Sequence, residues 1–251
     1  MDPSAIPIID HPVLRVEGGI VCAGDLHIGI ETEYANKGVH IPSQTHVMEH
    51  ELIDLGSCGK RLVLLGDIKH QVPGSSRQEL TEIPGFLTRL ADAFEGVDLV
   101  KGNHDGGIKK FLPGGVIIHP PTGFTLGDVG FAHGHTWPSK EVMSRRLLIV
   151  AHNHPAIMFK DGLGKVTTER CWLRCRFRDD AVTGYMELPE ELIVIPALNR
   201  SIGGFPVNIE GGRLLGPLFS RNLVELETAG VYLVDGIHLG QLGDLMIQRS
   251  K

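Results

Sequence analysis

Aspartate, asparagine and histidine residues gather at five points of the sequence, each directly after a short apolar run. In chain order the clusters are Asp25-Leu26-His27, Gly66-Asp67, Gly102-Asn103-His104-Asp105, His133-Gly134-His135 and His152-Asn153-His154. Carboxylate and amide oxygens suit hard divalent cations, and borderline transition metals also accept imidazole nitrogen. Two ions about 3.5–4 Å apart that share one carboxylate can clamp the attacking and leaving oxygens of a displacement at phosphorus. The residue types therefore predict a metal site.

The first three clusters follow segments that the sequence predicts to be strands of βα units. Apolar runs over residues 20–24, 61–66 and 97–102 are typical of buried strands, and each run stops at a polar residue. Helical spacing predicts helices over residues 42–56 and 80–96, the second beginning close to Pro84. Ligands bind outside the carboxyl ends of strands in open α/β sheets, so we expect all five clusters to converge on one crevice.

After Gly107 the pattern changes to shorter strand-like stretches. Strands are predicted over residues 116–119, 124–126, 129–133 and 147–152, with a hairpin turn at Gly127-Asp128, a short helix beginning near Ser139 and a late hairpin at Asp235-Gly236. On a strand, His152 and His154 would point to one face, as two ligands or as a half-buried pair. The 251 residues contain no internal repeat, low-complexity tract or linker, which favours one domain over residues 1–251.

Composition excludes several classes of protein. The net charge of −6, from 24 basic and 30 acidic residues, argues against a uniformly basic nucleic-acid coat but allows a local basic groove. Four scattered cysteines do not form a disulfide framework or a zinc knuckle, and we expect free, buried thiols. The apolar runs fall short of the ~20 residues of a membrane span, and the N-terminus lacks a signal pattern, so we expect a cytoplasmic protein without a membrane partner. A homo-oligomer is compatible with the sequence.

The ordered series D-x-H, G-D, G-N-H-D, H-G-H and A-H-N-H resembles the calcineurin-like metallophosphoesterase superfamily. Gly66-Asp67-Ile68-Lys69-His70, the segment from His133 to Pro138, and Pro196-Ala197-Leu198-Asn199 look like the ICC-like branch, which is related to nucleases of the Mre11 and SbcD type. In the usual last motif, G-H-x-H, a glycine stands where this chain has Ala151, and both histidines are kept. The resemblance implies an α/β fold, a single-domain four-layer α/β/β/α sandwich. Its motif core is residues 20–154, and residues 155–251 complete the second sheet.

The resemblance also implies roles for the clustered residues. Asp25, His27 and His154 would hold one metal, Asn103, His133 and His152 the other, and Asp67 would bridge them. Two carboxylates against two dications leave a surplus of about +2, which attracts a phosphate ester. His104 would act as general acid or stabilise the leaving oxygen, and Asp105 would orient its ring. The mixed nitrogen and oxygen donors suit two Mn²⁺ ions, with Fe²⁺ or Zn²⁺ as alternatives, better than Mg²⁺ or Ca²⁺.

The function implied is hydrolysis of a phosphoester, foremost a phosphodiester in DNA, RNA or a nucleotide, because the relatives by motif are nucleases. A phosphomonoesterase acting on a small metabolite would use the same seven ligands. A non-catalytic scaffold with this fold is the third alternative, but such a protein would have lost ligands, and here every position is filled.

Several further residues carry weaker signals, each with a structural alternative. His70 and Lys69 follow Asp67 closely, so they either face the substrate or lie in a solvated loop. For Asn199 and Arg200, the alternatives are contact with phosphate and capping of a turn. His135 could replace His133 as a ligand, whereas we treat His119 and His238 as structural. Trp172, Arg174, Arg176 and Arg178 alternate on one face of a strand, either as a nucleic-acid path or as a solvated edge strand.

Overall fold

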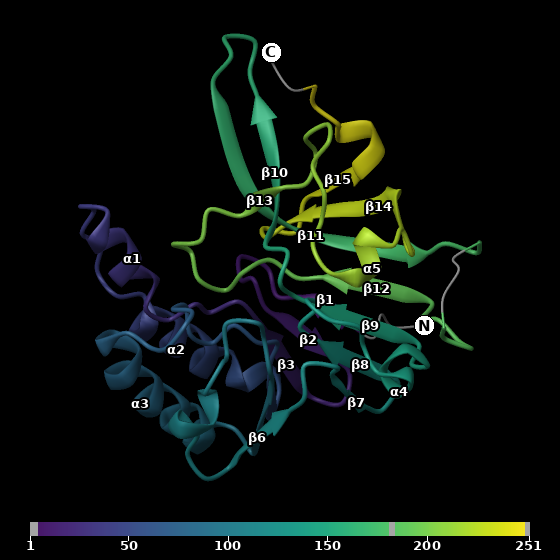
Figure 1. Cartoon of the computed structure of the whole chain (residues 1–251). Coiled ribbons are helices and arrows are strands. Elements are labelled where there is room, and N and C mark those ends of the chain that lie inside the picture. The colour runs from purple at the N-terminus through teal and green to yellow at the C-terminus, as the bar shows by residue number, and fades with distance from the viewer. Residues whose placement is uncertain (1–4, 181–183, 249–251) are drawn as a thin grey trace.

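The computed structural model of the chain describes residues 5–180 and 184–248. Its first sheet has six strands in the order β1-β2-β3-β4-β5-β6 (Figure 1). Strands β3 to β6 are parallel, and β1 and β2 add an antiparallel edge. The strands are β1 (Ala5–Pro7), β2 (Leu14–Val16), β3 (Ile20–Ala23), β4 (Arg61–Leu64), β5 (Gly96–Val100) and β6 (Val116–His119). The strands predicted in these regions are confirmed, and β1 and β2 were not predicted.

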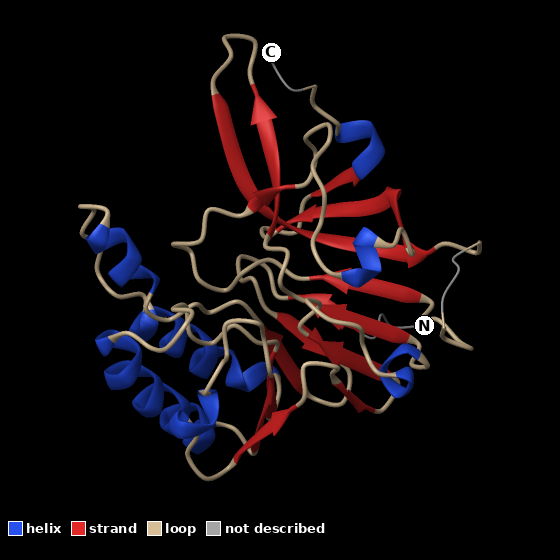
Figure 2. Cartoon of the chain, in the orientation of Figure 1, coloured by secondary structure: helices blue, strands red, loops and turns tan. Residues whose placement is uncertain are grey.

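The second sheet has nine strands, which come from residue 124 onward. Figure 2 draws the strands in red and the helices in blue. Strands β13-β10-β11-β12-β9-β8-β7 follow one another, while β14 pairs with β11 and β15 with β14. The strands are β7 (Phe124–Leu126), β8 (Val129–Ala132), β9 (Leu147–Val150), β10 (Pro155–Lys160), β11 (Val166–Phe177), β12 (Glu191–Val194), β13 (Phe205–Pro206), β14 (Val224–Leu233) and β15 (His238–Gln241). Antiparallel pairing of β7 with β8 and of β14 with β15 confirms both predicted hairpins.

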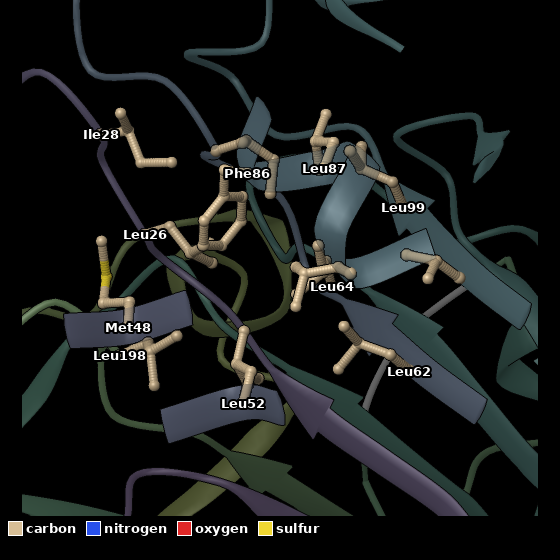
Figure 3. Close-up of a cluster of buried hydrophobic side chains, with 14 of the residues drawn as sticks. Leu26, Ile28, Met48, Leu52, Leu62, Leu64, Phe86, Leu87, Leu99 and Leu198 are labelled. Atoms are coloured by element: carbon tan, nitrogen blue, oxygen red, sulfur yellow. The ribbon is translucent and has the colours of Figure 1, made fainter. Parts of the chain in front are cut away.

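Helices cover the outer face of each sheet. Helices α2 (Thr45–Asp54) and α3 (Arg77–Ala93) pack on the first sheet, with Met48, Leu52 and Phe86 against Leu62 and Leu64 (Figure 3). The short helices α4 (Lys140–Met143) and α5 (Pro217–Ser220) and the 3₁₀ turn η3 (Leu242–Leu245) contribute apolar side chains to the core on the outer face of the second sheet. Ser139 caps α4 by accepting from the Val142 N–H, as predicted. Two further 3₁₀ turns are η1 (Leu55–Cys58) and η2 (Ile108–Phe111).

The prediction that α3 begins close to Pro84 is wrong. A capping box starts the helix at Arg77: the Ser76 hydroxyl accepts from the Glu79 N–H at 3.1 Å, and the Glu79 carboxylate accepts from the Ser76 N–H at 2.7 Å. Pro84 therefore lies inside the helix. Helix α1 (Ile30–Asn36) was not predicted, because its seven residues are too short for a clear helical period.

A third apolar cluster lies between the two sheets and joins them. It contains Cys22, Val63 and Leu65 from the first sheet and Phe131, Ile149 and Trp172 from the second, all of them buried. Helices, sheet, sheet and helices thus form the four predicted layers. The cysteines are free, as expected, and all except the half-buried Cys58 are buried. No helix in the described ranges has the length and apolar character needed to cross a membrane.

We expect Phe131→Ala to lower the free energy of unfolding by about 3–5 kcal/mol, because it opens a cavity between the two sheets. Phe159→Ala on β10, where the residue is 38% exposed, is the matched control and should cost on the order of 0.5 kcal/mol. Urea unfolding measures both. A loss under about 1 kcal/mol for Phe131→Ala would contradict the importance of this cluster.

Candidate metal centre

The five clusters meet at one edge of the molecule, where parallel strands of both sheets end. Asp25, Asp67 and Asn103 follow β3, β4 and β5 of the first sheet, and His133 and His152 follow β8 and β9 of the second. The two sheets therefore contribute candidate ligands to one site from opposite sides. This convergence is the arrangement expected at the carboxyl ends of the strands.

Left-handed backbone aims the clustered side chains into the site. Seven non-glycine residues in the described ranges have positive φ, and five of them are predicted ligands. These are Asp25 (φ 56°), His27 (42°), Asp67 (49°), His152 (70°) and His154 (43°). Such conformations cost on the order of 1–3 kcal/mol each and tend to persist at functional sites. The predicted strand over residues 147–152 is correspondingly too long: β9 ends at Val150, and both histidines lie in the loop beyond it.

Three groups of side chains in the described residues could hold a metal ion, and the third of them is His27, His70 and His104. The first group is Asp25, His27 and His154. One ligand atom from each lies within 4.8 Å of the other two. Asp25 Oδ1, His27 Nε2 and His154 Nε2 are buried and make no hydrogen bond within the described residues. Buried polar atoms without partners call for an explanation. These three donors suit a borderline divalent ion, which would satisfy all of them.

The second group is Asp67, His133 and His152, whose ligand atoms also lie within 4.8 Å of one another. His133 is fully buried, and its Nδ1–H donates to the Leu65 carbonyl at 2.7 Å. This bond directs Nε2 toward Asp67 Oδ2 at 3.3 Å and the Asn103 amide oxygen at 3.1 Å. A histidine whose second nitrogen is held by a backbone carbonyl is oriented as metal-ligating histidines are.

Asp67 belongs to the second group and also faces His27 of the first group. Its Oδ2 is 3.6 Å from His27 Nε2 and 3.3 Å from His133 Nε2, while its Oδ1 accepts from the His104 N–H at 2.8 Å. A Cβ on Gly102 would be 2.2 Å from Asp67 Oδ1, so the neighbouring loop needs a glycine. Asp67 thus has the position that a bridging carboxylate requires.

The electrostatics of the centre favour anionic carboxylates. Burial opposes ionisation of Asp25 and Asp67, but His154 and His133 outweigh it and hold the pKa of each carboxyl below its usual value. Burial would also lower the pKa of His133, yet Asp67 raises it to about 9. His133 is therefore protonated at neutral pH, and a metal at Nε2 has to displace that proton.

His27 is positioned by a chain of polar groups from α1. His70 Nε2 donates to Glu33 Oε2 at 2.6 Å, and His70 Nδ1 is 3.2 Å from His27 Nδ1. If His27 Nδ1 carries the proton of this contact, His27 Nε2 is left as a free lone pair in the centre. Burial lowers the pKa of His27 to about 3, which keeps the ring neutral. The sequence analysis missed Glu33, because α1 was not predicted.

His104 lies at the centre, but Asp105 does not orient it. The His104 ring is 4.7 Å from the His27 ring, and its Nδ1–H donates to the His70 carbonyl. Asp105 is buried, and its carboxylate accepts from the Ile68 N–H at 2.9 Å and the Gly102 N–H at 2.8 Å. The predicted role of Asp105 is therefore wrong: it ties together the loops that follow β4 and β5. Burial and the charge of Asp67 raise the pKa of Asp105 to about 6.

The predictions for the residues with weaker sequence signals have mixed outcomes. His70 borders a cleft of about 290 Å³ together with His104, so its contact with substrate stays a prediction. Lys69 is 1% exposed and donates to the Gly74 carbonyl at 2.8 Å, which excludes both alternatives given for it. Asn199 is fully buried, donates to the Leu26 carbonyl and accepts from the Ser201 N–H, so the turn cap is right and substrate contact is wrong. Arg200 faces Glu51 of α2 at 3.6 Å instead of the histidine groups.

Of the remaining histidines, one lies beside the metal centre and two make structural contacts elsewhere. His135 contacts the His133 ring, with centroids 5.1 Å apart, but belongs to none of the three possible ligand groups, so the geometry favours His133. His119 Nε2 donates to buried Asp98 at 2.7 Å, and His238 stacks on Tyr232. Both contacts agree with the structural roles expected for these two residues.

The arginines in β11 and directly after it do not form a free basic path. Arg174 makes two bonds to Glu191, Arg178 makes two to Asp180, and Glu225 lies opposite Arg176. The edge-strand alternative is also wrong, because β11 has pairing partners on both sides. Antiparallel pairing with β12 places Arg176 and Arg178 toward the N-terminal end of β12, the end opposite the histidines. Trp172 is buried between the sheets.

Comparison with solved structures identifies proteins of similar fold. The nuclease MPE of Pseudomonas putida matches with a TM-score of 0.57 and 17% identity, over 92% of this chain and 97% of that chain. YfcE, a phosphoesterase from E. coli, matches with a TM-score of 0.41 and 15% identity, over 88% of this chain and 97% of that chain. No family model and no curated protein matches the chain. The likeness to MPE confirms the predicted fold class, a mixed α/β fold with two sheets.

We expect Asp67→Asn to lose most of the bound metal, because the neutral amide cannot offset two dications held on either side of it. Plasma emission spectrometry after dialysis against Mn²⁺ measures the metal content. Asp128→Asn, at the exposed β7–β8 turn, is the matched control and should bind metal like the wild type. Full metal content in Asp67→Asn would show that this carboxylate is not shared between the groups.

Proposed function

We propose that this chain is a phosphoester hydrolase that uses two divalent metal ions, and that its preferred substrates are phosphodiesters of nucleic acid or nucleotides. The observation that carries the proposal is the pair of ligand groups on either side of Asp67. The buried atoms Asp25 Oδ1, His27 Nε2 and His154 Nε2, which make no hydrogen bond to any described residue, support it, because a divalent cation would satisfy all three at once.

The residues divide naturally between two ions. Asp25, His27 and His154 would hold one, Asn103, His133 and His152 the other, and Asp67 would contact both. Bound there, the ions would neutralise phosphate charge and lower the pKa of an attacking water. Mn²⁺ is the first candidate for this mixed nitrogen and oxygen set, followed by Fe²⁺ and Zn²⁺. The neutral amide of Asn103 keeps the site positive, which favours binding of a phosphate ester.

His104 is placed to serve the leaving group. Its Nδ1–H is engaged by the His70 carbonyl, so Nε2 is the nitrogen available to the substrate. A protonated Nε2 can pass its proton to the departing oxygen or stabilise the charge that develops there. The bond between the His104 N–H and Asp67 fixes the distance of this residue from the ligand groups.

The shape of the surface supports a diester more than a monoester. His104 borders two clefts, one of about 290 Å³ with His70 and Glu33, and one of about 270 Å³ with the ligand histidines. A diester carries two substituents and could use both, whereas a monoester has only one. The fold likeness to a nuclease points in the same direction.

Hydrolysis of bis-p-nitrophenyl phosphate and p-nitrophenyl phosphate, each with Mn²⁺ and with chelator, tests the function. We expect metal-dependent release of nitrophenol, faster from the diester. A preference for the monoester would support the phosphomonoesterase alternative. Absence of turnover with both esters, despite full metal content, would support the scaffold alternative.

We expect His104→Gln to keep its metal while turnover of the diester falls by a factor on the order of 10²–10⁴, the range for loss of a general acid. His50→Gln on the exposed side of α2 is the control and should keep wild-type turnover. Steady-state rates and metal content are measured on the same samples. If His104→Gln lacks one ion, His104 is a ligand and its assignment as acid fails.

A further inference from the structure

Two large apolar side chains stand exposed at the mouth of the metal centre. Phe205 is 44% exposed and Leu215 is 59% exposed. Both line the cleft of about 270 Å³ that also contains Asp67, His104, His152 and His154. Single exposed apolar residues are ordinary on a protein surface. Two that border the same cleft as the candidate ligands form a distinct apolar wall beside an otherwise polar site.

Hydrogen bonds to the last ligand cluster hold this wall in place. The Phe205 N–H donates to the His154 carbonyl at 2.7 Å, and Phe205 pairs with Pro155 in the parallel β13–β10 ladder. Asn153 stands between the two ligand histidines, and its side chain accepts from the Leu215 N–H at 2.6 Å and donates to the Leu215 carbonyl at 3.3 Å. Both apolar residues are therefore fixed relative to the ligands.

Glycines next to each residue permit this close approach. Gly204 has φ +59°, and a Cβ there would lie 2.7 Å from the Ala156 Cβ. Gly216 has φ +87°, and a Cβ there would lie 2.1 Å from the Gly134 carbonyl oxygen, inside the H-G-H cluster. Any other residue at either position would push the wall away from the centre.

The opposite side of His104 has a different chemistry. The cleft there is lined by Thr32, Glu33, Asn36 and His70. Glu33 accepts hydrogen bonds from Lys37 and His70, which lower the pKa of its carboxyl to about 2, so its oxygens remain hydrogen-bond acceptors at neutral pH. A planar apolar group is favoured on the Phe205 side, and a sugar hydroxyl or other neutral donor on the Glu33 side.

We propose that Phe205 and Leu215 form a platform on which the nucleobase of the substrate stacks while its phosphate lies at the metal centre. This inference rests on the proposed function and adds the substrate class, a nucleoside phosphate ester. Stacking of a base on an aromatic side chain changes affinity by roughly 5- to 150-fold, with little dependence on which base is bound. The platform therefore confers recognition of nucleotides in general rather than of one sequence.

The test compares the binding of adenosine 5′-monophosphate and ribose 5-phosphate to the manganese-loaded protein by calorimetry. Both ligands carry the same phosphate, so the difference in affinity reports the base alone. We expect the wild type to prefer the nucleotide by about tenfold or more. Phosphate release is checked after each titration, and phosphonate analogues of both ligands replace them if hydrolysis occurs.

Substitutions at Phe205 locate the preference. Phe205→Ala should reduce the nucleotide preference to under about threefold, and Phe205→Tyr should retain it, because a tyrosine ring also stacks. Phe159→Ala, an exposed aromatic on the β10–β11 hairpin (Figure 1), is the matched control and should keep the full preference.

Equal affinity of the wild type for both ligands, or an undiminished preference in Phe205→Ala, would overturn the platform. The proposed function is judged separately by metal-dependent hydrolysis of the aryl esters by the wild type. The platform can thus fail while the hydrolase stands.

Discussion

The buried carboxylate of Asp67 is the constraint on which the rest of the centre depends. It is 1% exposed, and a buried anion is tolerated only where charges or hydrogen-bond donors compensate it. His133 from the second sheet, His27 from the loop after β3 and the His104 N–H from the loop after β5 all face it. Asp67 therefore draws together segments from both sheets, and the apolar cluster between the sheets holds them in register.

Each of these partners is itself fixed by a group outside the centre. The Leu65 carbonyl orients His133, and the His70 carbonyl orients His104. Glu33 on α1 orients His70, which in turn contacts His27. Rings held in this way would lose little freedom on binding a metal or substrate, so less of the binding energy would be spent on ordering them. Helix α1, which the sequence analysis did not predict, therefore helps to position the site.

The strands and the clusters were predictable from sequence because their signals are local. Apolar runs that end in Gly-Asp or Gly-Asn mark β4 and β5, and hairpin turns at Gly127-Asp128 and Asp235-Gly236 mark two pairs of strands. The errors arose where the outcome depended on distant partners. Asp105 bonds to the loop after β4 rather than to the adjacent His104. Arg174 is neutralised by Glu191 of another strand, and Asn199 is buried against the Leu26 carbonyl.

The residues with positive φ show why the clusters predicted a candidate metal site and did not predict strands or helices. Aspartate and histidine are less favoured than glycine at positive φ. Glycine does stand at Gly66, Gly204 and Gly216, where the backbone must reverse or approach closely without a ligand atom. At the candidate ligand positions, aspartate or histidine stands at positive φ instead. The same division extends from the ligands to Phe205 and Leu215, whose glycine neighbours carry the strain so that the apolar side chains can reach the cleft. At this edge of the two sheets, strain thus falls on aspartate and histidine where the proposed function needs a donor atom, and on glycine where an apolar side chain must approach the cleft.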